Sequence, residues 1–433
     1  MVVNKFYRCK VCGETIRLRY QVGYCKMPIN LYCPKCNTHF SGEVSPNNDL
    51  SIVFSLNNAI ECDEIESGGY VAELSPEFLT IKYQENKSRL LPGVTPFLRY
   101  SLSKMKDENF EKRVQRIIHL AVESKEYASQ IETLFNLLNT NDVSLIRNYI
   151  DTLDNEYLLF YRKHSNVDNL STKLDYVLFA KQYSKSLINS SLLPKTHDSI
   201  DGLFRCFNTI INRNDKNEYK RLLKYLDEKN YFGLLFKEIP VFVVNYIDSF
   251  KQFVPCYLEY DNLGHIDFEE LGISSADACK MCEIYSNGFE LMGRIIDPSI
   301  ALDNLYSHMS FDNFGSGRTN FAEELAKYKS KFNKVEHFSE IDDSICCSFY
   351  RGLLNNRIRN PIAHYDWKID GLTQSITFTD RIKGVDTTMY LAELVFKCID
   401  VFNSVFFAWE VLYQLFKAKL TLIDKIGLNY SFK

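Results

Sequence analysis

Residues 109–138, NFEKRVQRIIHLAVESKEYASQIETLFNLL, space their apolar side chains three and four positions apart. This period is that of an amphipathic α-helix, which buries one face and exposes the other. Helical patterning of the same kind dominates from here to the C-terminus, whereas the first 100 residues are patterned differently. We therefore expect a mainly α protein that begins with a small β region.

The most apolar stretch, residues 391–416, predicts the last long helix, which we expect to begin near Thr388. One stripe of this helix should pack against the other helices, and it consists of Leu391, Leu394, Val395, Cys398, Phe402, Val405, Phe406 and Trp409. Charged residues also interrupt the stretch, and a membrane span rarely tolerates charges. These are Glu393, Lys397, Asp400 and Glu410.

The composition limits the classes of protein to which the chain can belong. The chain has 433 residues, of which 45% are apolar and 24% are charged, with a net charge of -4. Such a chain folds into globular domains, and its overall charge gives no sign of nucleic-acid binding. The N-terminus has no apolar core of secretory length. We therefore expect a soluble cytoplasmic protein with no membrane partner.

The N-terminal residues carry short alternating runs typical of strands, such as TIRLRY at 15–20 and YVAELS at 70–75. A connector rich in Pro and Gly, LLPGVTPF at 90–97, closes this part of the chain. The patterning predicts four regions. They are a zinc ribbon at 1–45, a small β region with its connector at 46–100, a helical middle domain at 101–250 and a C-terminal helical domain at 251–433.

Two Cys-x-x-Cys pairs, Cys9 with Cys12 and Cys33 with Cys36, predict a four-thiolate zinc ribbon. Four thiolates leave no coordination position for water, so the Zn²⁺ should be structural. Cys25 lies between the pairs and is an alternative ligand. The thirteen cysteines of the chain fit a reducing compartment better than a disulfide framework. A later pair, Cys279 and Cys282, lies at a helix start without a second pair nearby, so a packing role is expected there.

The predicted ribbon is basic. Residues 1–45 contain seven Lys and Arg against Glu14 and Glu43, a surplus of five positive charges that falls to about three with four thiolates and Zn²⁺. Such a surplus could bind the phosphates of RNA or DNA. A solvated surface or a protein-docking module is an equally good interpretation.

Residues 357–367, RIRNPIAHYDW, contain the side chains that best indicate a phosphate-binding or catalytic site. Pro361 disfavours helical geometry at Asn360, so we expect Asn360 to cap a fresh short helix with Pro361 as its first residue. His364 would lie in its first turn, where the positive end of the helix attracts phosphate. Arg359 could bind the same phosphate. The plainer alternative is that His364 packs and Arg359 forms a surface ion pair.

Two short strands are predicted after this motif, in WKIDGLTQSITFTD at 367–380, around a turn at Asp370 and Gly371. The segment RNPIAH at 359–364 resembles the motif of the HEPN superfamily, in which Arg precedes His by a few residues and Asn follows the Arg. Residues 255–420 resemble HEPN domains of abortive-infection and antiphage proteins. The strand insert departs from the plain four-helix form of that family.

The resemblance implies an endoribonuclease that needs no catalytic metal. Arg359 would stabilise the scissile phosphate, His364 would transfer protons, Asn360 would hold their geometry, and the ribose 2′-hydroxyl would attack. A homodimer through the HEPN domain is implied, and antiphage abortive infection or toxicity under a phage-derived or cellular trigger is the expected setting. The alternatives are a non-catalytic HEPN scaffold and a zinc-ribbon regulator that binds nucleic acid or protein.

Four further residues are candidates for substrate binding. Arg351 and Asn355 precede Arg359 at intervals of four, which places all three on one helix face. Tyr365 and Asp366 follow His364 and could stack a base or orient the imidazole. None of these side chains identifies the RNA, so tRNA, mRNA and rRNA all remain open.

Overall fold

The computed structural model describes residues 2–23, 26–46, 52–63, 69–85, 95–104, 110–140, 142–153, 156–188, 196–213, 216–312, 353, 355–381 and 384–427. Two residues with sequence-based predictions, Cys25 and Arg351, lie outside the described residues.

Contacts group the chain into two compact units, each built from three segments. Unit 1 comprises Met1–Lys125, Asp248–Ser286 and Arg357–Ile399. Unit 2 comprises Glu126–Ile247, Asn287–Asn356 and Asp400–Lys433. The four regions predicted from the sequence stay a prediction, because this grouping records compactness and not independent folding.

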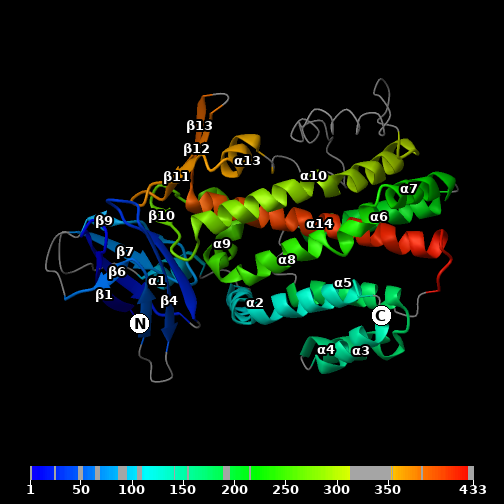
Figure 1. Cartoon of the computed structure of the whole chain (residues 1–433), viewed down its shortest axis with the longest axis horizontal. Coiled ribbons are helices and arrows are strands. Elements are labelled where there is room, and N and C mark those ends of the chain that lie inside the picture. Colours follow the sequence, from blue (N-terminus) through cyan, green and yellow to red (C-terminus); the bar gives the residue numbers. More distant parts are fainter. Residues whose placement is uncertain are drawn as a thin grey trace. The chain divides into compact units, whose positions relative to one another are not determined.

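The N-terminal strands of unit 1 form two sheets that share one core (blue in Figure 1). The five-stranded sheet has the order β6-β1-β2-β7-β9, with β1 (Val2–Cys9), β2 (Thr15–Gln21), β6 (Ala59–Glu61), β7 (Tyr70–Leu74) and β9 (Gln84–Glu85). The three-stranded sheet has the order β3-β4-β5, with β3 (Met27–Tyr32), β4 (His39–Pro46) and β5 (Ile52–Leu56). Neighbours are antiparallel except β2 and β7, which are parallel.

The sequence of β2 shows why this strand covers a core. Successive side chains of a strand point to opposite faces. Ile16, Leu18 and Tyr20 are all buried, and they alternate with the less buried Arg17 and Arg19. The same alternation supports the predicted strand at 15–20.

A third sheet in unit 1 follows the Arg-His segment. It has the order β11-β12-β13, with β11 (Trp367–Ile369), β12 (Ser375–Asp380) and β13 (Val385–Tyr390). The first two strands confirm the hairpin predicted around Asp370 and Gly371. The expected helix start near Thr388 is wrong, because β13 continues to Tyr390. The last helix begins at Leu391, where the Glu393 carboxylate accepts a hydrogen bond from the Tyr390 N–H (2.7 Å) and so caps the helix.

The other elements of unit 1 are short. They are α1 (Pro96–Lys104), α9 (Val254–Glu259), most of α13 (Asn356–Ala363) and the pair of strands β8 (Thr80–Ile81) and β10 (Leu271–Gly272). Three long helices contribute residues to both units, namely α2 (Phe110–Leu138), α10 (Ala278–His308) and α14 (Leu391–Leu422). The bounds of α2 confirm the helix predicted at 109–138.

Unit 2 is helical in the residues that the structure describes (Figure 1). Its helices are α3 (Val143–Thr152), α4 (Glu156–His164), α5 (Lys173–Ile188), α6 (Thr196–Asn212), α7 (Lys216–Glu228) and α8 (Glu238–Asp248), together with its parts of the long helices. The predicted mainly α class with small sheets is therefore confirmed.

The C-terminal part of α14 forms the centre of unit 2. The Phe402 ring stacks on Tyr246 of α8, with ring centroids 3.9 Å apart. Trp409 is fully buried and packs against Phe135 of α2. The whole predicted stripe of α14 is buried, and most other side chains at 401–412 are buried as well. A helix that is apolar all round belongs inside a protein core.

A buried ion pair accounts for the acidic residue in this part of α14. Glu410 contacts Lys181 of α5, and both side chains are almost fully buried. Lys185 lies 3.6 Å from the same carboxylate. Burial raises the pKa of the Glu410 carboxyl, but Lys181 and Lys185 outweigh burial and bring this pKa down to about 2. Across the described residues, no helix is both long and apolar enough to cross a membrane.

Candidate functional site

The first cysteine pair lies in the turn between β1 and β2. Cys9 ends β1, and its N–H donates to the Glu14 carbonyl (2.8 Å). The Gly13 N–H donates back to the Cys9 carbonyl (3.0 Å), and Gly13 has a φ of 74°. Only glycine adopts this left-handed conformation without steric cost. The turn therefore presents Cys9 and Cys12 on the same side.

The second pair repeats this geometry between β3 and β4. The Cys33 N–H donates to the Thr38 carbonyl (2.9 Å), and the Asn37 N–H donates to the Cys33 carbonyl (2.9 Å). Asn37, at the position that corresponds to Gly13, has a φ of 59°. Asparagine tolerates the left-handed region better than most residues with a side chain. Cys33 and Cys36 thus lie in a second knuckle of the same form.

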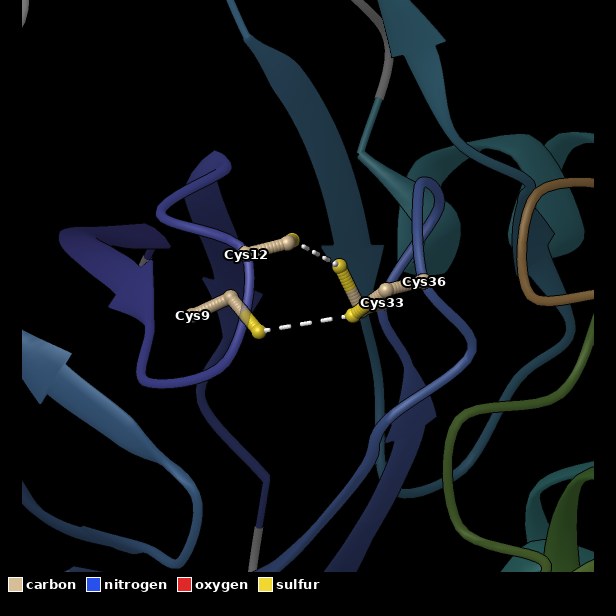
Figure 2. A group of neighbouring side chains, drawn as sticks. All are labelled: Cys9, Cys12, Cys33 and Cys36. Carbon is tan, nitrogen blue, oxygen red and sulfur yellow. Dashed lines mark hydrogen bonds between the residues drawn. The ribbon is translucent and has the colours of Figure 1, made fainter.

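The two knuckles bring their four sulfur atoms together (Figure 2). Cys9 Sγ lies 3.7 Å from Cys36 Sγ, and Cys12 Sγ lies 3.5 Å from Cys33 Sγ. All four sulfurs lie within 4.8 Å of one another. A tetrahedron of thiolates around an ion at about 2.3 Å has edges of about 3.8 Å. The cluster is therefore close enough to hold a metal ion, and no other such group occurs among the described residues.

The thiols of the cluster differ in their electrostatic surroundings. The Thr38 hydroxyl lies 3.0 Å from Cys36 Sγ, and this hydrogen bond lowers the pKa of Cys36 to about 6. Burial raises the pKa of Cys33 and of Cys12. A cation at the centre would favour the thiolate form of all four.

Ion pairs reduce the basic surplus that the sequence shows for residues 1–45. Four of the seven basic side chains there have acidic partners, in the pairs Lys5–Glu61, Arg19–Glu73, Lys26–Glu43 and Lys35–Glu14. Glu61 and Glu73 lie outside residues 1–45, so they offset two of the five surplus charges. The electrostatic argument for a phosphate partner is weaker than the sequence alone indicates.

Arg359 and Asn360 lie inside one short helix and His364 follows directly after it, so the predicted break at Asn360 is wrong. Helix α13 runs from Asn356 to Ala363, with Pro361 inside it. Ile358, Pro361 and Ile362 are all buried. Their burial outweighs the bias against helical geometry before proline.

His364 lies at the C-terminal end of α13 and not in a first turn. Its N–H donates to the Asn360 carbonyl (3.1 Å). Tyr365 follows with a φ of 57°, its N–H donates to Ile362 (3.2 Å), and the Asp366 N–H donates to Pro361 (2.8 Å). This pair of bonds is a Schellman motif, which ends helices. The expected attraction of phosphate by a helix N-terminus therefore does not apply to His364.

Asn360 contacts both residues of the predicted catalytic pair. Its Oδ1 accepts a hydrogen bond from Arg359 Nη1 (3.2 Å), and its carbonyl accepts the His364 N–H. The His364 and Tyr365 side chains are exposed, whereas those of Arg359 and Asn360 are half-buried. The half-buried Asn355 directly precedes α13, and its predicted helical partner Arg351 lies outside the described residues.

The hairpin after α13 is tied to the helix end and to the cysteine cluster. Asp366 pairs with Arg381, and its carbonyl accepts the Thr379 N–H (2.9 Å). At the hairpin turn, the Gly371 N–H donates to Asn37 Oδ1 (2.7 Å). A Cβ on Gly371 would lie only 2.5 Å from the Cys33 carbonyl. The sequence indicated the turn but not this contact, because nothing local to Gly371 identifies its partner.

Within the described part of the chain, the later cysteine pair belongs to no group of side chains that could hold a metal ion. Cys282 is buried, as its predicted packing role requires, whereas Cys279 is exposed. Burial raises the pKa of both thiols.

Comparison of the chain with family models, with curated proteins and with solved structures finds no match.

Proposed function

We propose that the chain is an endoribonuclease of the HEPN type that cleaves RNA at Arg359 and His364 without a catalytic metal. The observation that carries the proposal is the position of Asn360, which contacts the Arg359 guanidinium through its side chain and His364 through its backbone. An Arg on a short helix and a His directly after it, both in contact with one residue and with the imidazole exposed, can act on a phosphate from solvent.

The chemistry needs no group beyond the substrate and these side chains. The ribose 2′-oxygen attacks the neighbouring phosphorus while His364 takes part in proton transfer from the 2′-hydroxyl to the departing 5′-oxygen. The P–O5′ bond breaks, which leaves a 2′,3′-cyclic phosphate and a 5′-hydroxyl. Arg359 stabilises the charge that develops on the phosphoryl oxygens. The main task of the protein is to position the RNA, because the attacking 2′-hydroxyl is already part of the substrate.

A second copy of the chain completes the site in this proposal. Five residues of an α-helix turn through about 500°, so the directions of Arg359 and His364 differ by about 140°. Two such helices in a homodimer can direct an Arg and a His at one phosphate more easily than one helix can. The helical segments of residues 251–433 would form the dimerising HEPN domain.

The metal of the four-cysteine cluster is Zn²⁺ with a structural role in this proposal. Four thiolates with short sulfur–sulfur separations fill a tetrahedral zinc site and leave no position for a water or a substrate. The zinc would hold the two N-terminal sheets together and take no part in cleavage.

His364→Ala tests the nuclease proposal directly. Wild type should degrade cellular RNA and leave 2′,3′-cyclic phosphate ends, with reduced cell viability during phage challenge. His364→Ala should abolish all three effects, whereas His265→Ala, which removes another exposed histidine of unit 1, should not. Equal RNA integrity in wild type and His364→Ala, with and without phage, would exclude the proposal.

A matched pair of arginine variants tests the phosphate role. Arg357 is exposed on the same helix, two residues before Arg359. Arg359→Ala should lower the cleavage rate by about 100-fold or more, as expected for loss of a transition-state charge contact. Arg357→Ala should lower it far less. Similar losses in both variants would show that only general positive charge matters.

The alternative, a non-catalytic HEPN scaffold that docks a protein through its ribbon, is favoured by one observation. Val11, between two cysteines of the first knuckle, is 70% exposed, and Ile60 on the neighbouring strand is 55% exposed. Apolar side chains on a ribbon whose basic residues are largely paired fit a protein partner better than a phosphate backbone. This alternative predicts intact RNA in every variant.

A further inference from the structure

Tyr83 carries a buried hydroxyl group that no hydrogen bond satisfies. The residue lies just before β9, and its half-buried ring packs against the core that the two N-terminal sheets share. The hydroxyl oxygen is shielded from solvent and has no hydrogen-bond partner among the described residues. Burying a hydroxyl without a partner costs free energy, and the large majority of buried polar groups in proteins are paired. A nearby acceptor would remove this cost.

The four-cysteine cluster is near this hydroxyl and offers an acceptor. Cys9 and Cys33 belong to the core against which the Tyr83 ring packs. Burial raises the pKa of the Tyr83 hydroxyl, and negative charge on Cys33 and then on Cys9 raises it further. A phenol keeps its proton at neutral pH and can donate it in a hydrogen bond. The hydroxyl is therefore a donor beside the two buried cysteines of the cluster.

The cluster becomes strongly negative when it holds a divalent cation, because four thiolates and one such ion have a net charge of -2. Cys12 and Cys36 are half-buried and so partly open to water, whereas Cys9 and Cys33 are buried. Burying charge without hydrogen bonds is costly. The two buried thiolates therefore depend on donors from the protein.

Donors from the second knuckle already reach two of the sulfurs. The backbone N–H groups of Lys35 and Cys36 contact the Cys33 thiol, which works against the effect of burial on its pKa. The Thr38 hydroxyl lies 3.0 Å from Cys36 Sγ. In metal sites, outer hydrogen bonds of this kind orient the ligands and strengthen metal binding. The Tyr83 hydroxyl is a further donor of the same kind.

We propose that the Tyr83 hydroxyl donates a hydrogen bond to the Cys33 thiolate once the cluster holds a metal ion, and that Tyr83 is a positioning residue of the metal site. The inference rests on the proposed metal at the cluster and is independent of RNA cleavage. A thiolate accepts a stronger hydrogen bond than a neutral thiol does. Because β9 pairs with β7, this bond would join the five-stranded sheet to the second knuckle of the other sheet.

Tyr83→Phe removes the hydroxyl, keeps the ring and so tests the contact in the full chain. Competition with a chromogenic chelator should show that this variant binds Zn²⁺ about 10- to 100-fold more weakly than wild type. Thr38→Val, which removes the hydroxyl beside Cys36, should weaken binding in the same way. Tyr70→Phe is the matched control and should bind Zn²⁺ as wild type does, since it removes a hydroxyl from the ring that packs edge-on against Tyr83.

Co²⁺ in place of Zn²⁺ distinguishes a hydrogen bond to sulfur from a general loosening of the core. Such a bond withdraws electron density from the thiolate. Its loss should therefore move the sulfur-to-cobalt charge-transfer band to longer wavelength in Tyr83→Phe and Thr38→Val, but not in Tyr70→Phe.

Equal Zn²⁺ affinity of wild type and Tyr83→Phe would overturn the inference and leave the metal site in place. Weaker binding with an unshifted cobalt band would also overturn it, because the ring change would then act on the core alone. A wild-type chain that binds neither ion would overturn the metal assignment together with this inference. None of these readouts depends on RNA cleavage, so the nuclease proposal is tested separately.

Discussion

Asn360 is the residue that joins the two proposed catalytic groups, through Oδ1 to Arg359 and through its carbonyl to His364. The two contacts differ in how they depend on the side chain. The backbone bond to His364 survives any substitution that keeps the helix, whereas the bond to Arg359 needs an acceptor in the side chain. A positioning role for Asn360 can therefore be tested through its side chain alone.

Asn360→Ala should reduce single-turnover RNA cleavage by about 10- to 100-fold, because the Arg359 guanidinium loses an acceptor that fixes its direction. Asn356→Ala, four residues earlier on α13, is the matched control and should cleave near the wild-type rate. The free energy of unfolding, measured with urea, should fall by about 1 kcal/mol in Asn360→Ala. An unchanged cleavage rate in Asn360→Ala would show that Asn360 does not position Arg359 for cleavage.

The residues of the motif could be identified from the sequence, but their local conformation could not. The preference of the residue before proline is a bias of modest size. Burial of Ile358 and Ile362 decides the outcome in α13, and burial depends on parts of the chain far away in sequence. Arg359 and Asn360 therefore lie in the middle of a helix, and His364 lies just after its end and not in a first turn. Tyr365 was identified as a candidate without its strained backbone, which no local sequence signal shows.

At the scale of elements, the β11–β12 hairpin depends on a contact at its turn. The Asp-Gly pair was sufficient to predict the turn, since both residues favour it. Its partner Asn37 lies 334 residues away, and a single sequence carries no signal for such a pairing. The cysteine knuckles are the opposite case, because their ligands are fixed by spacing within a few residues.

Gly371→Ala should loosen the hairpin from the second knuckle. The added Cβ would lie 2.5 Å from the Cys33 carbonyl, and a backbone atom inside a metal knuckle cannot easily shift. We expect a loss of about 1–3 kcal/mol in the free energy of unfolding, measured with urea. Gly264→Ala is the control, because a Cβ there meets no atom within 4 Å. Equal stability of the two variants would show that the Cys33 carbonyl moves away from the added Cβ without a loss of unfolding free energy.

Helix α14 offers a second test at this scale. Glu410→Gln leaves the buried Lys181 without its carboxylate partner and should cost about 3–5 kcal/mol of unfolding free energy. Replacing both residues, in Lys181→Met with Glu410→Met, should cost much less, because no unpaired charge remains buried. Denaturant unfolding of the two single variants and the double variant gives the coupling energy. Equal costs for Glu410→Gln and the double variant would contradict this account.

The pair also predicts a pH dependence. The pKa of Glu410 falls from 4.5 to about 2 on folding. Between pH 4.5 and pH 2 the folded state therefore binds fewer protons than the unfolded state. The stability that Glu410 contributes is complete above pH 4.5 and is lost as the pH falls through 2. Wild type should therefore lose more stability than Glu410→Gln between pH 5 and pH 2, as measured by thermal unfolding. Parallel curves for the two proteins would contradict the prediction.

On the scale of the whole molecule, the two units are each assembled from three separated segments. Composition and periodicity were sufficient to predict a mainly α protein with an N-terminal β region, because both signals are local. They do not show that residues 357–399 join the N-terminal strands in one unit, since that association depends on contacts between distant segments.

If the four-cysteine cluster holds a metal ion as proposed, removal of that ion should reveal the association of residues 357–399 with the N-terminal strands. After treatment with a chelator, amide hydrogen exchange should speed up in residues 2–46 and also in residues 367–380, because the hairpin turn rests on the Cys33–Asn37 knuckle. Residues 216–247 of unit 2 should keep their protection and serve as the internal control. Unchanged exchange in residues 367–380, with faster exchange in residues 2–46, would contradict the predicted coupling.

The bond between Asn37 and Gly371 also bears on when the proposed ribonuclease can become active during synthesis. The turn that docks on the knuckle leaves the ribosome more than 300 residues after the knuckle itself. Domains fold as their residues emerge, so the N-terminal sheets can form long before their last partner exists. A nascent chain would therefore hold its metal site without a positioned Arg359 and His364. The proposed ribonuclease would therefore be unable to attack RNA beside the ribosome before residues 357–371 have been made.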